Sequence, residues 1–196
     1  ICPCPPATEA DIAHWADTQR LRRYQAVDPA ISEKTRADYT AIVTGGVDDA
    51  QNIYLMWCER SQTAQPGNVI VREYERWSPV YAIAIEQAGW QINQIRNQTL
   101  LPLKPITPDA DKRTRALPHA INYENHKVYH PKRASWLAAF EREHVGFTGA
   151  RNAPGHDDQV DANVYLGKLI STHQRKLRGR AAHFIRSTVR STAGIR

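Results

Sequence analysis

The sequence has few cysteines, a single methionine and no apolar run long enough to span a bilayer. Cys2 and Cys4 stand too close together for the usual zinc knuckle, and no second pair accompanies Cys58. The first six residues lack the basic region and apolar core of a secretion signal. We therefore expect no structural zinc and a reducing compartment. Because the chain does not begin with methionine, we expect a fragment or a processed product of about one ordinary domain.

Acidic residues are missing from the last part of the chain. None follows Asp161, although the whole sequence has 26 basic and 20 acidic residues and a net charge of +6. This distribution favours a protein that binds phosphate backbones and has an acidic centre. The alternative is a solvated basic tail without a specific partner. The basic residues of this segment are Lys168, Arg175, Lys176, Arg178, Arg180, Arg186, Arg190 and Arg196.

Alternating apolar strands and amphipathic helices predict an α/β domain. The first three strands are close enough in sequence for an antiparallel meander, with a turn bracketed by Gly45-Gly46 and Asp48-Asp49. Pro118 should kink or interrupt its helix. The order predicts a mixed sheet covered by helices on both faces, with an entry segment at 1–20, the domain at 21–173 and a basic tail at 174–196. Strands are predicted at 22–28, 39–44, 52–58, 80–86, 101–105 and 126–129, and helices at 8–18, 65–77, 89–98, 109–123, 135–145 and 156–173.

Acids stand at the ends of two predicted strands and at the start of the last helix. Asp28 ends the first strand, and Glu86 ends a buried apolar strand. The segment HDDQVDA at 156–162 then places Asp157, Asp158 and Asp161 within one helical turn. Taken singly, these acids are turn or cap residues as readily as site residues. Such closely packed carboxylates are costly unless a proton or a cation neutralises them.

Together, these acids suit a divalent-metal site. Mg²⁺ and Mn²⁺ prefer carboxylate and water oxygens, and side chains at strand ends line the ligand crevice of open sheets. Two ions roughly 3.5–4 Å apart can activate water and stabilise a leaving oxygen in phosphodiester hydrolysis. No Ser/His/Asp or Cys/His arrangement competes with this interpretation.

Seven segments in the same order resemble one known family, the C-terminal nuclease domain of the large terminase subunit of tailed bacteriophages. The last segment is the most specific, and together they cover about residues 22–165. The resemblance implies a ribonuclease-H-like fold and metal-dependent cutting of double-stranded viral DNA during genome packaging. The segments are AVDPA at 26–30, ADYTAI at 37–42, IAIE at 83–86, PDADKRTRA at 108–116, VYHP at 128–131, SWL at 135–137 and HDDQVDA at 156–162.

The resemblance also implies roles for particular residues. Asp28 matches the first catalytic acid, Glu86 the second, and the third falls on Asp157 or Asp158. Asp161 and His156 stay open as further ligands or as groups that position a ligand. The cofactor is Mg²⁺ or Mn²⁺, with two ions expected. Lys112, Arg113 and Arg115 would contact phosphate, with a solvated helix face as the alternative, and the tail residues Arg175, Lys176, Arg178 and Arg180 would contact DNA.

The chain departs from a full terminase subunit because it has no Gly-x-x-x-x-Gly-Lys-Ser/Thr phosphate loop. We therefore expect an isolated domain that cuts DNA but does not translocate it. The resemblance implies the portal protein and the small terminase subunit as partners, the host cytoplasm as location and no membrane. Two alternatives stay open: another ribonuclease-H-like nuclease such as a junction resolvase, and a non-catalytic module that docks on DNA or the portal.

Overall fold

Six strands form one mixed sheet in the order β5-β4-β1-β2-β3-β6 within the residues that the computed structural model describes. These residues are 11–29, 39–63, 65–86, 100–108, 110–150 and 155–193, by backbone alone from 177 onward. β1, β2 and β3 are antiparallel neighbours, which confirms the predicted meander. β4 runs parallel to β1, β5 to β4 and β6 to β3. The strands are β1 (Arg22–Asp28), β2 (Thr40–Val47), β3 (Ile53–Ser61), β4 (Val80–Glu86), β5 (Leu103–Ile106) and β6 (Val128–Tyr129).

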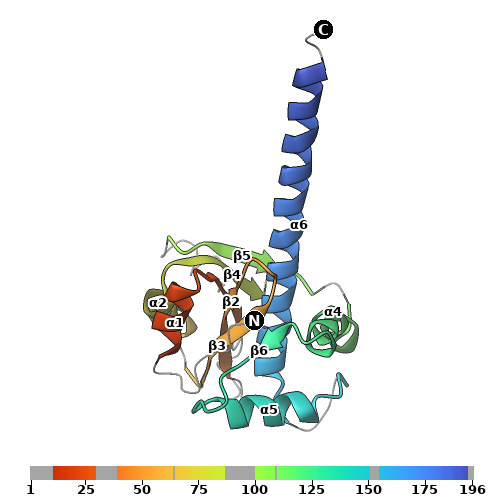
Figure 1. Cartoon of the computed structure of the whole chain (residues 1–196). Helices are drawn as coiled ribbons and strands as arrows, with labels where there is room; N and C mark the ends of the chain where they lie inside the picture. Colours follow the sequence, from red (N-terminus) through yellow and green to blue (C-terminus); the bar gives the residue numbers. More distant parts are fainter. Residues whose placement is uncertain are drawn as a thin grey trace.

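Helices cover both faces of this sheet (Figure 1). On one face lie α1 (Ile12–Thr18) and α2 (Pro66–Trp77). The other face carries α5 (Leu137–Gly146) and α6 (Asp158–Ala193), and α4 (Lys112–Glu124) packs against α6. The predicted mixed sheet with helices on both faces is therefore confirmed. Among the described helices, none is both long and apolar enough to cross a bilayer.

The sheet surface beneath α6 is built from small side chains. Ala26, Ala41 and Ala84 are fully buried there, in one cluster with Tyr165 and Leu166 of α6. Small residues let a helix axis approach a sheet closely, because little side-chain volume separates the backbones. This packing brings the first turn of α6 close to the carboxyl ends of β1 and β4. The opposite face of the same strands carries larger residues, Val27, Ile42, Ile83 and Ile85.

The turn predicted between Gly45-Gly46 and Asp48-Asp49 comes later than expected, because both glycines lie inside β2 and the chain turns at 49–50. A Cβ at Gly45 would stand 2.9 Å from Leu166 Cδ2, and one at Gly46 would stand 2.8 Å from a leucine side chain of the opposite face. Glycine here permits close packing on both sides of a strand. The chain reverses after Asp48, whose carboxylate accepts hydrogen bonds from the backbone and side chain of Asn52, both at 2.8 Å.

Two helices differ from what the sequence patterns predict. Pro118 lies inside α4 without interrupting it, and the helix continues to Glu124. The predicted end near His173 is also wrong, since α6 runs to Ala193. No proline follows residue 154, and Arg, Lys, Ala and Leu of the basic segment are good helix formers. The predicted helix at 89–98 falls outside the described residues, and the domain divisions stay a prediction.

A buried polar cluster holds α4 and α5 against α6. Asn163 of α6 lies at its centre, with its Oδ1 3.2 Å from His119 Nε2 of α4. Its Nδ2 donates to the Tyr123 hydroxyl at 3.0 Å and lies 3.0 Å from His144 Nε2 of α5. Burial lowers the pKa of His119 and of His144 to about 4, so both rings are neutral at pH 7. The cluster therefore fixes where the basic first turn of α4 lies beside α6.

Gly167→Ala should destabilise the protein by about 1–3 kcal/mol. A Cβ at Gly167 would overlap the His119 ring, 2.6 Å from its Cγ, and the bond to Asn163 keeps that ring in place. The matched control is Gly146→Ala at the end of α5, where a Cβ meets nothing within 4 Å. The control should keep or slightly raise stability. Urea unfolding measures both; equal midpoints for the two variants would contradict the close contact.

Candidate functional site

Three of the acids that the sequence singles out lie at one edge of the sheet. Asp28 ends β1 and Glu86 ends β4, and these strands are parallel neighbours with Val27 paired to Ile85. Asp158 is the first residue of α6, which packs across β1, β2 and β4. The carboxyl ends of parallel strands meet at the same edge, which brings Asp28 beside Glu86, and the packing of α6 places Asp158 near enough for its charge to act on Asp28.

The charges of these acids act on one another. Burial raises the pKa of Asp28 well above its usual value, and the charges of Asp161, Glu86 and Asp158 raise it further. Burial and the charge of Glu143 raise the pKa of Asp158 to about 6. Each shift means that ionising one carboxylate is opposed by its neighbours and by the loss of water. The site is therefore short of positive charge when all its acids are ionised.

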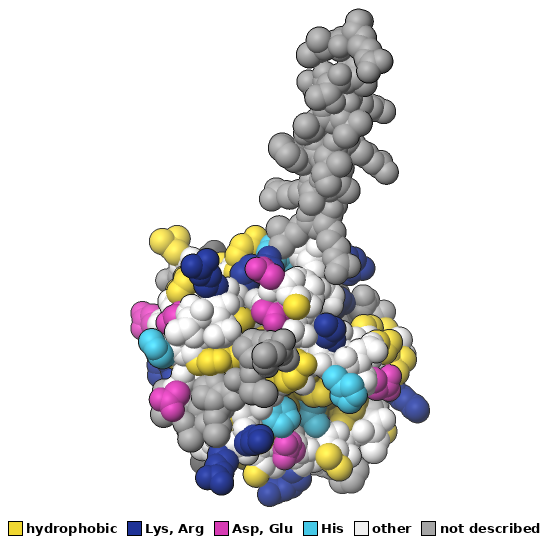
Figure 2. All heavy atoms as spheres, viewed as in Figure 1, with side chains coloured by type: hydrophobic (Ala, Val, Ile, Leu, Met, Phe, Trp, Pro, Cys, Tyr) yellow, Lys and Arg dark blue, Asp and Glu magenta, His cyan; other side chains and the backbone are white. Residues whose placement is uncertain are grey.

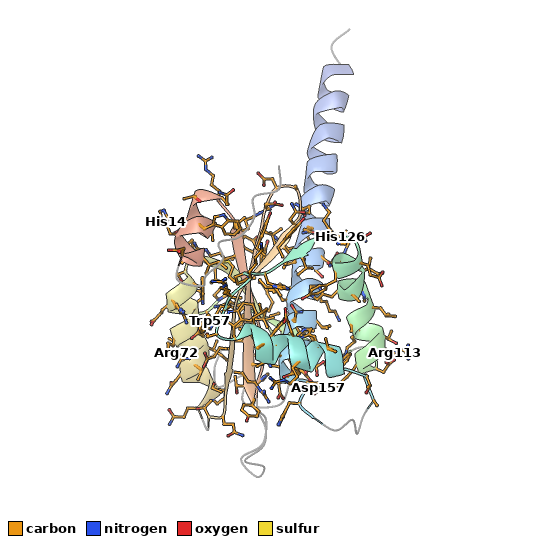
Figure 3. All side chains as sticks on the ribbon, turned by 60° about the horizontal axis from the view of Figure 1, so that its bottom comes forward. His14, Trp57, Arg72, Arg113, His126 and Asp157 are labelled. Atoms are coloured by element: carbon orange, nitrogen blue, oxygen red, sulfur yellow. The ribbon has the colours of Figure 1, made fainter. Side chains whose placement is uncertain are left out.

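The two adjacent aspartates of the HDDQVDA segment differ in their partners. Lys112 of α4 places its Nζ 2.6 Å from Asp157 Oδ2 and 2.7 Å from Asp161 Oδ2. Asp158 Oδ2 is buried without a hydrogen-bond partner, and His156 Nδ1 lies 3.6 Å from it. Figure 3 shows Asp157 at the end of α6 that adjoins α5. A lysine thus neutralises Asp157 and Asp161, whereas Asp158 keeps an oxygen that no donor satisfies.

A chain of hydrogen bonds orients Glu86. The Tyr165 hydroxyl of α6 donates to the Glu86 carboxylate and accepts from Arg115 Nη1 at 2.6 Å. Arg115 also contacts Asp161 with its Nη2, at 3.4 Å. Burial raises the pKa of Tyr165, so the hydroxyl keeps its proton and stays a donor. Arg115 of α4 therefore helps to position Glu86 through the Tyr165 hydroxyl.

Two residues of this arrangement were missed by the sequence analysis. Tyr165 stands seven residues after Asp158 on the same helix, so the helical period was a signal that could have found it. Glu143 of α5 accepts hydrogen bonds from the first turn of α6. The sequence gives no comparable signal for Glu143, because its partners lie sixteen and seventeen residues away across a glycine-rich loop.

The donor set fits a hard divalent cation. Asp28, Glu86 and Asp158 supply carboxylate oxygens, the ligands that Mg²⁺ and Mn²⁺ prefer. The buried, unpartnered Oδ2 of Asp158 and the raised pKa of Asp28 both indicate a place where positive charge is needed. Within the described ranges, however, no three acidic, histidine or cysteine side chains stand close enough to hold a metal as they are arranged.

The predicted DNA-contacting residues fall into two groups. Lys112 and Arg115 face the acids, whereas Arg113 is exposed on α4 (Figure 3). Arg175 and Lys176 are exposed on α6, whose backbone continues through Arg178 and Arg180. A groove of about 620 Å³ runs between α4 and α6, with Arg115, Lys168 and Arg175 in its lining. On the face shown in Figure 2, basic and acidic side chains are interspersed over the body.

Known proteins share this architecture. The family model of the terminase RNase H-like domain matches residues 25–167. The large terminase nuclease of thermophilic phage G20c with bound magnesium superimposes with a TM-score of 0.59 at 13% identity, over 76% of this chain and 81% of that one. The large terminase nuclease domain of Thermus phage P74-26 gives 0.57 at 14%, over 75% and 78%.

A longer protein shows the same likeness. The large terminase of another thermophilic bacteriophage gives a TM-score of 0.57 at 10% identity, over 76% of this chain but only 40% of that one. No curated protein sequence matches the chain. The family match and these structures confirm the ribonuclease-H-like fold and the resemblance drawn from the sequence.

Proposed function

The chain belongs to the terminase RNase H-like domain family, and we propose that it is a metal-dependent endonuclease that cleaves double-stranded viral DNA during genome packaging. The observation that carries this proposal is the group of Asp28, Glu86 and Asp158 at one sheet edge, with a buried oxygen of Asp158 left without a donor. No competing nucleophile and base pair occurs in the sequence.

The three carboxylates of Asp28, Glu86 and Asp158 would hold Mg²⁺ or Mn²⁺, with two ions as the expected number. A bound divalent cation activates water and offsets charge on the scissile phosphate. Tyr165 holds Glu86 through its hydroxyl, and Lys112 holds Asp157. We assign Asp157, Asp161 and His156 to positioning, because the first two already bond a lysine and His156 lies beside Asp158.

The groove between α4 and α6 is where we place the DNA backbone. It adjoins the acids through Arg115 and continues along α6 past Lys168 to Arg175. Phosphate contacts by such cations give affinity and orientation without reading sequence. Arg113 and the outer part of α6, with Lys176, Arg178 and Arg180, would extend the same contact, and removing their charges should weaken binding and lower its salt dependence.

We extend the proposal to the packaging assembly. The chain has no phosphate loop, so it would cut DNA while an ATPase elsewhere moves it. The portal protein and the small terminase subunit are the proposed partners, and the host cytoplasm is the proposed location.

Nicking of supercoiled plasmid tests the function. The protein should convert the plasmid to open-circular and linear forms with Mg²⁺ or Mn²⁺, and chelation by EDTA should stop the reaction. Linear and branched duplexes of equal length are compared in parallel. Faster cutting of the branched duplex would favour a junction resolvase, and retention of DNA without cleavage in any metal would favour a docking module.

A further inference from the structure

Glu143 of α5 is a buried acid that bonds the start of α6. Its carboxylate is 5% exposed and accepts the backbone N–H of Gln159 at 2.6 Å and that of Val160 at 3.2 Å. It also accepts the side-chain amide of Gln159 at 2.6 Å. The first N–H groups of a helix have no partner within the helix, so this carboxylate caps α6 from a neighbouring element.

The same turn is anchored on its other side. The Gln159 Oε1 accepts from Cys58 Sγ of β3 at 3.3 Å. The backbone that carries Asp158 is therefore held by α5 and β3 together. None of the hydrogen bonds found for Glu143 goes to the Asp158 carboxylate, so Glu143 acts on it through the backbone.

Glu143 adds a second negative charge close to Asp158. Its negative charge lies near Asp158, and the only basic group paired with it in the described residues is Arg60, at 3.9 Å. An uncharged acceptor would cap the helix without adding a buried charge to an acidic site. A charged cap is reasonable where a cation is to be bound, because it strengthens the negative potential there.

We propose that Glu143 is a positioning residue for the cation site, which fixes the first turn of α6 so that Asp158 faces Asp28 and Glu86. This role rests on the proposed nuclease function. We assign Glu143 to positioning and not to direct ligation, because its carboxylate already bonds three donors of Gln159 and Val160.

Glu143→Gln tests the role, with Glu141→Gln as the matched control. Glu141 lies on the same helix, and its side chain is 54% exposed, so the control removes the same charge away from the turn. The Mn²⁺-induced rise in melting temperature is titrated without DNA, and cleavage and metal-free DNA affinity are measured separately. Glu143→Gln should raise the Mn²⁺ midpoint at least about tenfold, with unchanged DNA affinity, whereas Glu141→Gln should leave it unchanged.

A lower melting temperature of Glu143→Gln with an unshifted Mn²⁺ midpoint would overturn the proposal, since Glu143 would then be a structural cap only. If Glu143→Gln does not fold, Glu143→Asp keeps the charge but shortens the side chain, which withdraws the carboxylate from the N–H groups of Gln159 and Val160, and a wild-type midpoint there overturns it equally. Wild-type protein that shows no Mn²⁺ response at all would overturn the nuclease proposal itself, which separates the two failures.

Discussion

Asp158→Asn should abolish plasmid nicking, with a loss on the order of a thousandfold or more, while raising the melting temperature of the metal-free protein. The substitution keeps the shape of the side chain and removes one charge from a group in which burial and the charge of Glu143 raise the pKa of Asp158 to about 6. At pH 7 the ionised carboxylate therefore weakens the fold, and the amide relieves that cost.

Asp157→Asn is the informative comparison because it changes the adjacent residue in the same way. The Asp157 carboxylate pairs with Lys112 at 2.6 Å, whereas Asp158 has a buried oxygen without a hydrogen-bond partner. Cleavage should fall by about tenfold or less, because Lys112 keeps Asp161 as a second partner at 2.7 Å. Nicking and thermal unfolding in EDTA measure both variants. A larger loss for Asp157→Asn than for Asp158→Asn would reverse the assignment of the two aspartates.

The acids at the strand ends could be predicted from sequence because their placement depends on local patterns. Asp28 and Glu86 each end an apolar strand, and an apolar run bounded by polar residues shows where a strand stops. Parallel pairing of β1 with β4 then brings both acids to one edge. The HDDQVDA segment shows three acids in one helical turn in the same way. Fold class and acid cluster thus follow from patterns spanning a few residues.

Contacts between distant segments could not be predicted in this way. Asp157 and Asp158 look alike in sequence, and only the position of Lys112, forty-five residues earlier, separates them. The cap by Glu143 depends likewise on how α5 crosses the start of α6. Gly45 and Gly46 were misread for a related reason, since glycine serves both turns and close packing, and the composition of the segment does not tell the two uses apart.

The rise in melting temperature on binding a divalent metal should depend strongly on pH. At pH 8 a saturating concentration of Mg²⁺ or Mn²⁺ should raise the melting temperature by about 5–10 °C, as expected for a ligand present at roughly a hundred times its dissociation constant. At pH 5 the rise should be small. The ligands must be ionised to bind, and the pKa of Asp158 is raised to about 6 and that of Asp28 well above its usual value.

Proton linkage gives the direction in which the stability of the metal-free protein changes with pH. A carboxylate with a raised pKa binds more protons in the folded state, so its stabilising contribution is present below its ordinary pKa and is lost as pH rises through the raised value. His119 and His144 act oppositely, since burial lowers the pKa of each to about 4 and their contribution is lost as pH falls from about 6.5 to 4. The metal-free curve mixes both effects, so the informative quantity is the difference with and without metal at each pH.

Asp158→Asn is the control for this difference. It removes the ligand that ionises near pH 6, so the metal-induced rise should become small at every pH. Differential scanning fluorimetry from pH 5 to pH 8, with EDTA and with Mn²⁺, provides the measurement. An equal rise at pH 5 and pH 8 in the wild type, or an undiminished rise in Asp158→Asn, would place the bound ion away from Asp28, Glu86 and Asp158.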